Sequence, residues 1–288
     1  MLKEFALLVA TIGLTGCAGE DAPDNGSDAV AIANGAAAVE ETSIVRLDCG
    51  TIKVGNFSKT FSDRQIYAPG PKTLTDSCYL ITHKGQQLLW DTGLPATLKG
   101  KTKTEGDFTT SLDKTIPDQL AVLGLKPEDI DIVGISHMHF DHSGQAAQFP
   151  QARLVIGKAD YDQSAGKDDP FGPWRKTQPA AVTLVVGGRS DLFGDGKVLA
   201  LHLPGHTPDH LALLVNLASG PVLLSGDLYH AEEAREKRGV PPFNTDRAQT
   251  LASMDTFEAL AKQTGAKVII QHEPADIGKL PTFPEAAK

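Results

Sequence analysis

Four side chains that can bind a metal ion lie close together in the middle of the chain. They are His137, His139, Asp141 and His142, and an apolar stretch comes directly before them. Imidazole and carboxylate groups are typical ligands of zinc and of similar first-row metals. Because alternate residues of an extended segment point the same way, we expect His137 and His139 to share one metal ion. Asp141 and His142 lie just beyond them and are expected to turn toward a second.

Three further potential ligands each follow a later apolar stretch: His206 after Leu203-Pro204-Gly205, Asp227 after Leu224-Ser225-Gly226, and His272 after residues 268–271. Taken alone, such a residue is more often capped or solvated than bound to metal. Together with the first four ligands, these three favour a shared metal centre, because strand ends can converge at one edge of a sheet. No cysteine lies near them, so the pattern does not indicate a thiolate-rich structural zinc site.

The elements that must position these ligands are mostly short strands. Hairpin turns are predicted at Lys84-Gly85 and Ser219-Gly220, residues 94–112 are predicted to form a loop, and helices are predicted over 113–123 and 246–264. In the second helix, Asp246 and Gln249 suggest a capping box, and Gly265 suggests a C-cap. Two packed sheets covered by helices are the expected architecture. The predicted strands are 43–54, 78–82, 87–90, 132–135, 152–156, 182–186, 198–203, 211–215, 222–224 and 268–270.

Composition excludes several classes of protein. Of the 288 residues, 41% are hydrophobic and 22% are charged, which is typical of a globular protein rather than a disordered one. The 36 acidic residues outnumber the 27 basic ones, giving a net charge of -9, so a nucleic-acid partner is not expected. No apolar run reaches the length of a membrane-spanning helix, which excludes a polytopic membrane protein.

The N-terminal segment is expected to be a targeting signal rather than part of the fold. Residues 1–16 have the features of a signal peptide, and Leu14-Thr15-Gly16-Cys17 resembles the lipobox of bacterial lipoproteins. That resemblance implies a lipid anchor on Cys17, with Ala18 favouring the outer membrane or periplasm of a Gram-negative bacterium; an ordinary secretory signal is the alternative. Residues 17–42 are acidic and Ala-rich and are interpreted as a tether, which leaves 43–288 as one domain.

The order of the ligands, with HxHxDH first and PGH, GD and a late histidine following, resembles the metallo-β-lactamase superfamily across roughly residues 43–275. The resemblance implies an α/β fold, an αββα sandwich of two mixed sheets flanked by helices, with two zinc ions or other divalent first-row metals at one edge. It implies that one metal is bound by His137, His139 and His206, the other by Asp141, His142 and His272, and that Asp227 bridges them.

Such a centre leaves coordination positions open, which is a catalytic pattern. A hydroxide held between two metals would attack an acyl or phosphoryl centre, with Asp141 expected to handle a proton. The chemistry expected is therefore metal-assisted hydrolysis.

Within the superfamily, residues 47–50, 76–81, 89–93, 226–230 and 243–246 most resemble the quorum-quenching N-acyl-homoserine lactone lactonases. Those lactonases place a catalytic tyrosine three residues after the bridging aspartate. Here Tyr229 is two residues after it and His230 is three after it, so either is a candidate donor to the lactone carbonyl, and packing is the alternative role for Tyr229. The expected partner is a small acyl lactone. The alternatives are a glyoxalase-II-type thioesterase, a β-lactamase, or a metal-binding lipoprotein without activity.

Roles outside the metal centre are expected for two other histidines and for two of the cysteines. His83 is expected at the surface, and His210 is expected to orient a metal ligand by hydrogen bonding. Cys49 and Cys78 lie on early strands. They would pair in an oxidising compartment, but two buried free thiols are the favoured expectation.

Overall fold

The computed structural model describes residues 41–288, which form two β-sheets packed face to face. The predicted signal peptide and Cys17 lie outside these residues, as does the tether up to residue 40. Among residues 41–288, no helix is long and apolar enough to cross a membrane.

The first sheet has eight strands in the order β4-β5-β1-β2-β3-β6-β7-β8. The strands from β4 to β3 pair antiparallel, whereas β3, β6, β7 and β8 pair parallel, so the sheet is mixed. Its strands are β1 (Ser43–Val54), β2 (Lys72–His83), β3 (Gln86–Trp90), β4 (Lys101–Glu105), β5 (Phe108–Leu112), β6 (Ile132–Gly134), β7 (Arg153–Gly157) and β8 (Val182–Val185).

The second sheet has five strands in the order β13-β12-β11-β10-β9. Only β12 and β13 pair parallel, so this sheet is mixed as well. Its strands are β9 (Arg189–Asp191), β10 (Val198–His202), β11 (Leu211–Leu217), β12 (Gly220–Leu224) and β13 (Lys267–Ile269).

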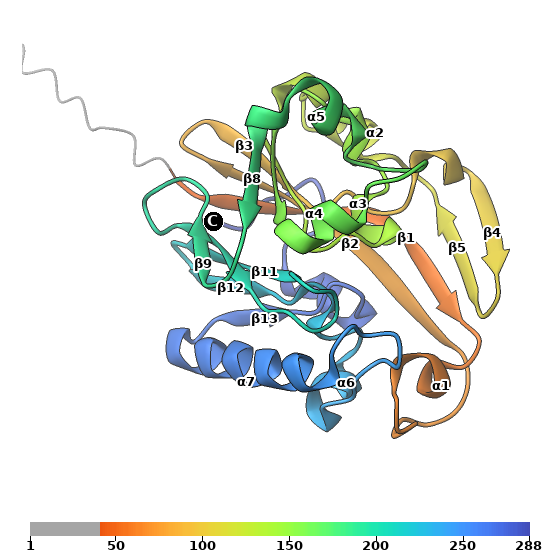
Figure 1. Cartoon of the computed structure of the whole chain (residues 1–288). Coiled ribbons are helices and arrows are strands. Elements are labelled where there is room, and N and C mark those ends of the chain that lie inside the picture. Colours follow the sequence, from red (N-terminus) through yellow and green to blue (C-terminus); the bar gives the residue numbers. More distant parts are fainter. Residues whose placement is uncertain (1–40) are drawn as a thin grey trace, which may run out of the picture. The chain divides into compact units, whose positions relative to one another are not determined.

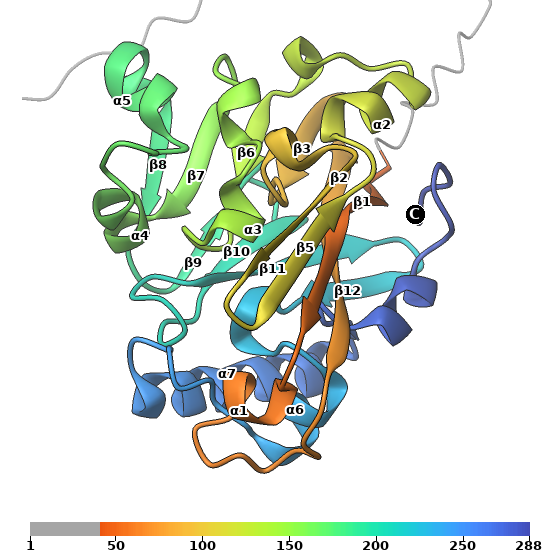
Figure 2. The ribbon, with the colours of Figure 1, turned by 90° about the vertical axis from the view of Figure 1, so that its right-hand side faces the viewer.

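Helices cover the outer face of each sheet, as Figures 1 and 2 show. The α-helices are α1 (Phe57–Phe61), α2 (Ile116–Val122), α3 (Phe140–Ser143), α4 (Lys158–Gln163), α5 (Gly172–Thr177), α6 (Glu232–Lys237) and α7 (Arg247–Thr264). Short 3-10 helices span Ala96–Leu98, Pro127–Asp129, Ala146–Gln148, Pro179–Ala181, Gly226–Leu228 and Pro274–Lys279. Helices α2, α4 and α5 pack on the first sheet and α7 packs on the second. The predicted αββα sandwich is confirmed.

The core follows from strands that are apolar on both faces. In β3, Leu88 and Trp90 point between the sheets, while Leu89 points to the helices on the outer face. Successive strand residues point to opposite faces, so a strand buried on both sides needs a continuous apolar run. This is why runs such as the one in β3 were recognisable as strands.

Helix α7 forms as its end residues predict. The Asp246 side chain accepts a hydrogen bond from the backbone N–H of Gln249 at 2.9 Å, and Gly265 ends the helix with a φ of 65°. Met254, Phe257 and Ala261 recur at helical spacing and are buried against the second sheet.

Three expectations from the sequence are wrong. Residues 94–112 are not a loop, because they contain the β4–β5 hairpin; every residue of β4 is exposed, so no apolar alternation marks it as a strand.

His83 is not at the surface. It is buried, with Thr42 Oγ1 2.9 Å from Nδ1 and Asp195 Oδ2 2.8 Å from Nε2. Thr42 is itself buried in this contact, so it belongs to the domain rather than to the tether.

The favoured expectation of two free thiols is also wrong, because Cys49 and Cys78 form a disulfide between β1 and β2. A register shift between Asp48 and Gly50 makes Cys49 the extra residue of a β-bulge. A bulge redirects the side chain that it inserts. The two Cα atoms lie 5.8 Å apart, which is within the range that a disulfide needs. The sequence shows no sign of such a bulge.

Candidate metal centre

The seven predicted ligands come together at one edge of the sandwich. His137 and His139 lie between the end of β6 and helix α3, and Asp141 and His142 lie in α3 itself. His206 follows β10, Asp227 follows β12 and His272 follows β13. Each strand delivers its ligand where the chain leaves the sheet, which is how residues from distant parts of the sequence meet.

The first group consists of His137, His139, His206 and Asp227, whose potential ligand atoms all lie within 4.8 Å of one another. Nε2 of His137 is 2.9 Å from Nδ1 of His139, and Nε2 of His206 is 3.1 Å from both. Three ring nitrogens therefore converge on one point, which is the arrangement that a metal ion requires of its imidazole ligands.

The second group consists of Asp141, His142 and His272, and the same limit of 4.8 Å holds for it. Asp227 lies between the two groups. Its Oδ1 is 3.1 Å from His142 Nε2 and 3.0 Å from His272 Nε2, whereas its Oδ2 is 3.3 Å from His206 Nε2. One carboxylate oxygen thus faces each group, as expected of a bridging ligand. Oδ1 is buried, and apart from these two ring nitrogens no residue in 41–288 donates a hydrogen bond to it, so a cation is the partner that fits it.

Hydrogen bonds to the far ring nitrogens orient the ligands. His142 Nδ1 lies 3.0 Å from Asp91 Oδ2, and His272 Nδ1 donates to the Thr75 carbonyl oxygen at 2.8 Å. These contacts leave the Nε2 lone pairs free for metal, and such supporting partners commonly set ligand orientation. His206 and His137 are held in the same way, by Asn244 Oδ1 at 2.9 Å and Ser136 Oγ at 3.0 Å.

His210 holds the backbone of Asp227. Its Nε2 accepts from the Asp227 N–H at 3.0 Å, while its Nδ1–H donates to the Leu203 carbonyl oxygen at 3.1 Å. A Cβ added at Gly226 would lie 2.6 Å from His210 Nε2, so the residue before Asp227 has to be glycine for this contact to form. The expectation that His210 orients a ligand is confirmed.

The electrostatics of the protein without metal favour metal binding at the first group. Burial, followed by repulsion from His142, holds the pKa of His137 well below its usual value, and burial also lowers the pKa of His206. Neutral imidazoles can bind a metal without first losing a proton. At the second group, burial opposes the charged form of His272 but the Asp227 carboxylate outweighs it and raises the pKa of His272 to about 9. Metal binding there displaces a proton.

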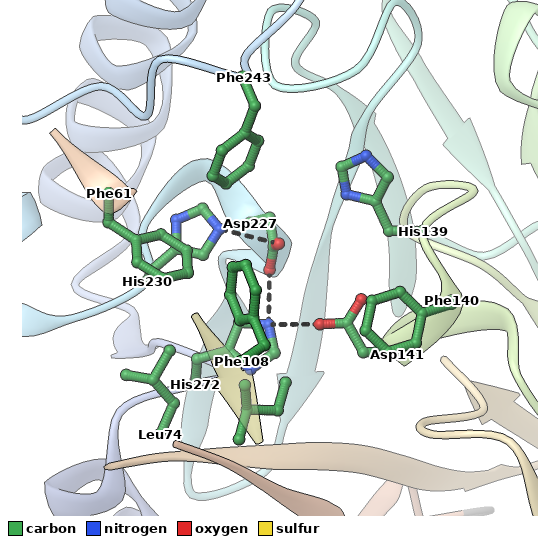
Figure 3. Close-up of a pocket in the computed structure, with 11 residues that line it drawn as sticks. Phe61, Leu74, Phe108, His139, Phe140, Asp141, Asp227, His230, Phe243 and His272 are labelled. Carbon is green, nitrogen blue, oxygen red and sulfur yellow. Dashed lines mark ion pairs between the residues drawn. The ribbon is translucent and has the colours of Figure 1, made fainter. Parts of the chain in front are cut away.

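An apolar pocket of about 350 Å³ opens directly beside the two groups (Figure 3). Its polar side is formed by His139, Asp141, Asp227, His230 and His272. Its apolar walls are Ile52, Phe61, Leu74, Phe108, Phe140 and Phe243. These wall residues come from segments far apart in the sequence. No local pattern singles them out, and sequence reasoning missed most of them.

Of the two predicted donors to substrate, only His230 reaches this pocket. Its Nε2 lies 3.0 Å from Asp227 Oδ2, and its ring centroid is 4.5 Å from that of Phe61. Tyr229 points the other way. Its hydroxyl donates to Glu258 Oε1 at 3.0 Å, and its ring packs on Phe257 under α7. The expectation that Tyr229 contacts substrate is therefore contradicted by its position, because its side chain lies under α7 and is not among the residues of 41–288 that line the pocket.

Comparison with known proteins agrees with this geometry. The N-acyl homoserine lactonase AttM of Rhizobium johnstonii is 29% identical over 225 residues, which cover 72% of this chain and 85% of AttM. AiiA of Bacillus thuringiensis subsp. kurstaki, also an N-acyl homoserine lactonase, is 25% identical over 217 residues with the same coverage. The fold is similar to a crystal structure of a B. thuringiensis AiiA mutant with N-decanoyl-L-homoserine bound at its active site. That match has a TM-score of 0.73 and 20% identity, and it covers 86% of this chain and 100% of the other.

A similar fold is found in AidC, a dizinc quorum-quenching lactonase, with a TM-score of 0.59 and 18% identity over 86% of this chain and 90% of that one. The family model of the metallo-beta-lactamase superfamily matches residues 73–272, a range that contains all seven ligands. With its two-sheet sandwich and its paired groups of metal ligands, this chain belongs to the metallo-beta-lactamase superfamily.

Proposed function

We propose that this protein is a dinuclear zinc hydrolase that opens the lactone ring of N-acyl-homoserine lactones. The observation that carries the proposal is the position of the two ligand groups, which share Asp227 and face an apolar pocket. Curated relatives named N-acyl homoserine lactonases support the substrate class. So does a structural neighbour that holds N-hexanoyl-L-homoserine at its catalytic metal centre.

The residues present fit two zinc ions. Nitrogen and oxygen ligands are the types that zinc prefers, and three ligands from each group leave room for water or substrate. His137, His139 and His206 would hold one ion, Asp141, His142 and His272 the other, and Asp227 would bridge them. When bound, the ions supply Lewis acidity, which generates hydroxide from water near neutral pH and polarises a carbonyl group.

The protein's own side chains position the substrate and move its protons. The apolar walls would bind the acyl chain and exclude water, so that the lactone ring lies at the polar side of the pocket. His230 is placed to donate a hydrogen bond to the carbonyl oxygen, where negative charge develops. Asp141 lines the pocket with an oxygen 3.8 Å from His272 Nε2, and it is the candidate to carry a proton to the departing ring oxygen.

The pocket argues against a thioesterase of glyoxalase II type as the alternative. No Lys or Arg is among the residues of 41–288 that line it, whereas the carboxylates of glutathione call for cationic partners. A β-lactamase remains the second alternative. The bridging position of Asp227 is evidence against it, because typical β-lactamases of this fold lack that carboxylate.

We also propose that the domain works outside the cytoplasm, anchored through Cys17. The Cys49–Cys78 disulfide supports this location, because structural disulfides persist in oxidising compartments and are rare in the cytosol. The apolar segment that precedes Cys17 in the sequence is the second support.

The activity can be tested with a panel of substrates. The purified protein supplied with zinc should release acid from N-acyl-homoserine lactones faster than from a chromogenic cephalosporin or a glutathione thioester. Asp227→Ala should lower lactone turnover by about 100-fold or more and lower the metal content, because a displacement of ~1 Å at the reacting groups has an effect of this size. Preference for the cephalosporin or the thioester, or unchanged lactone turnover in Asp227→Ala, would contradict the proposal.

Substitution at residues 229 and 230 tests the donor assignment. His230→Ala should lower kcat by ~10²–10³-fold while two metal equivalents are retained, because it removes a donor to the developing oxyanion. Tyr229→Phe is the matched control, since it removes a hydroxyl that is bonded to Glu258, and its kcat should stay near that of the parent. The assignment fails if Tyr229→Phe is slow and His230→Ala is not.

The anchor can be tested by fractionation of the native host. The parent protein should be processed and recovered with the outer membrane. A Cys17→Ala form should remain unprocessed or leave that fraction, because no sulfur remains to carry lipid. Identical mass and fractionation of the two forms would rule the anchor out.

A further inference from the structure

The Cys49–Cys78 disulfide lies directly against the turn formed by residues 91–94. Both cysteines are fully buried. The Leu94 N–H donates to the Cys49 carbonyl oxygen at 3.3 Å. A Cβ added at Gly93 would lie 2.3 Å from the Cys49 Cβ and 2.8 Å from its Sγ, and Gly93 has a φ of 60°. The backbone of the turn therefore rests on the side chain of Cys49, with no room between them.

The same turn holds His142, a ligand of the second group, by three contacts. Asp91 Oδ2 lies 3.0 Å from His142 Nδ1. The N–H and the hydroxyl of Thr92 both donate to the His142 carbonyl oxygen, at 2.7 and 3.0 Å. Both the ring and the backbone of His142 thus depend on the position of this turn. Of the first group, only His137 has a link to it, through the N–H of the preceding Ser136, which donates to Asp91 Oδ1 at 2.6 Å.

The disulfide takes the place of a ladder contact at Cys49. As the extra residue of the β-bulge, Cys49 has no partner in the register between β1 and β2. The backbone of the neighbouring Asp48 also bonds with Gln119, which accepts from its N–H and donates to its carbonyl oxygen, both at 2.8 Å. The ladder continues on either side, with Asp48 opposite Ser77 and Gly50 opposite Asp76, so the bond to Cys78 is what links Cys49 itself to β2.

We propose that the Cys49–Cys78 disulfide positions the second metal site, so that the ion held by Asp141, His142 and His272 is bound tightly only in the oxidised protein. This inference rests on the two-metal centre proposed above. Two thiol groups need more room than one disulfide, and the backbone of Gly93 leaves none. Reduction therefore displaces the turn, and His142 moves with it. In an oxidising compartment the enzyme would be fully loaded, whereas protein with reduced cysteines would bind its second ion weakly.

The reduction of the Cys49–Cys78 disulfide is a balanced reaction. With a water-soluble phosphine as reductant, the S–S bond breaks, phosphorus takes one oxygen atom from water and is oxidised to the phosphine oxide, and the two sulfurs take up the two protons of that water. The phosphine is preferable to a dithiol here, because thiolates are themselves zinc ligands.

The test measures metal affinity rather than activity. The full chain carrying Cys17→Ser retains only Cys49 and Cys78 of its three cysteines. Metal-free protein is titrated with zinc against a chromophoric chelator, with and without the phosphine. A Cys49→Ala/Cys78→Ala form of the same chain is titrated in parallel. The oxidised protein should bind two equivalents tightly. The double variant and the reduced protein should bind one as tightly and the other about 10–100-fold more weakly, because both lack the covalent link that fixes Cys49, and with it the turn, to β2. This is the usual effect of losing the support of a metal ligand.

Two controls separate positioning from general loss of stability. Met254→Ala creates a cavity under α7, away from the turn, and lowers Tm while both affinities should stay unchanged. The phosphine should have no effect on the double variant. The inference is overturned if the double variant binds both equivalents as tightly as the oxidised protein, or if Met254→Ala weakens zinc binding in the same way. A single equivalent in the oxidised protein would contradict the two-metal proposal instead. In that case the inference would fail if the Cys49→Ala/Cys78→Ala form bound its single zinc equivalent as tightly as the oxidised protein does.

Discussion

The arrangement of the two ligand groups depends on one buried carboxylate. Asp227 places one oxygen toward each ligand group, and five histidines of the metal centre or its rim lie within 3.6 Å of these two oxygens. Two dications held close together repel each other, and an anion shared between them offsets that repulsion. The backbone of Asp227 is fixed by His210, so its position is set by the fold and does not require a bound metal ion.

The sandwich is the means by which such a centre is assembled. Its seven histidine and aspartate ligands lose water when they are gathered in the interior, and burial alone disfavours their charged forms. The protein holds them in place with partners behind the rings: Asp91, Thr75, Asn244 and Ser136. Such support keeps each lone pair aimed at the centre, so that metal binding requires little rearrangement. The Cys49–Cys78 disulfide packs against the 91–94 turn that contains Asp91, and so supports it.

The sequence was informative where one short segment carries the signal. The HxHxDH motif and the ligands at strand ends predicted both groups, and apolar runs predicted most of the strands in both sheets. Features built from residues distant in sequence were not predictable. The pocket walls come from separate elements, and the bulge at Cys49 depends on pairing with β2. Strand β4 was missed for a different reason, because all of its residues are exposed and no apolar alternation marks it. The side of the chain to which Tyr229 and His230 each point was likewise decided by tertiary structure.

The most direct test of the central claim is anomalous diffraction at the zinc edge from crystals of the zinc-loaded protein. The account predicts two peaks ~3.5–4 Å apart, one beside His137, His139 and His206 and the other beside Asp141, His142 and His272, with one oxygen of Asp227 directed at each. A single peak in crystals grown with excess zinc, or two peaks with Asp227 bound to only one of them, would contradict it.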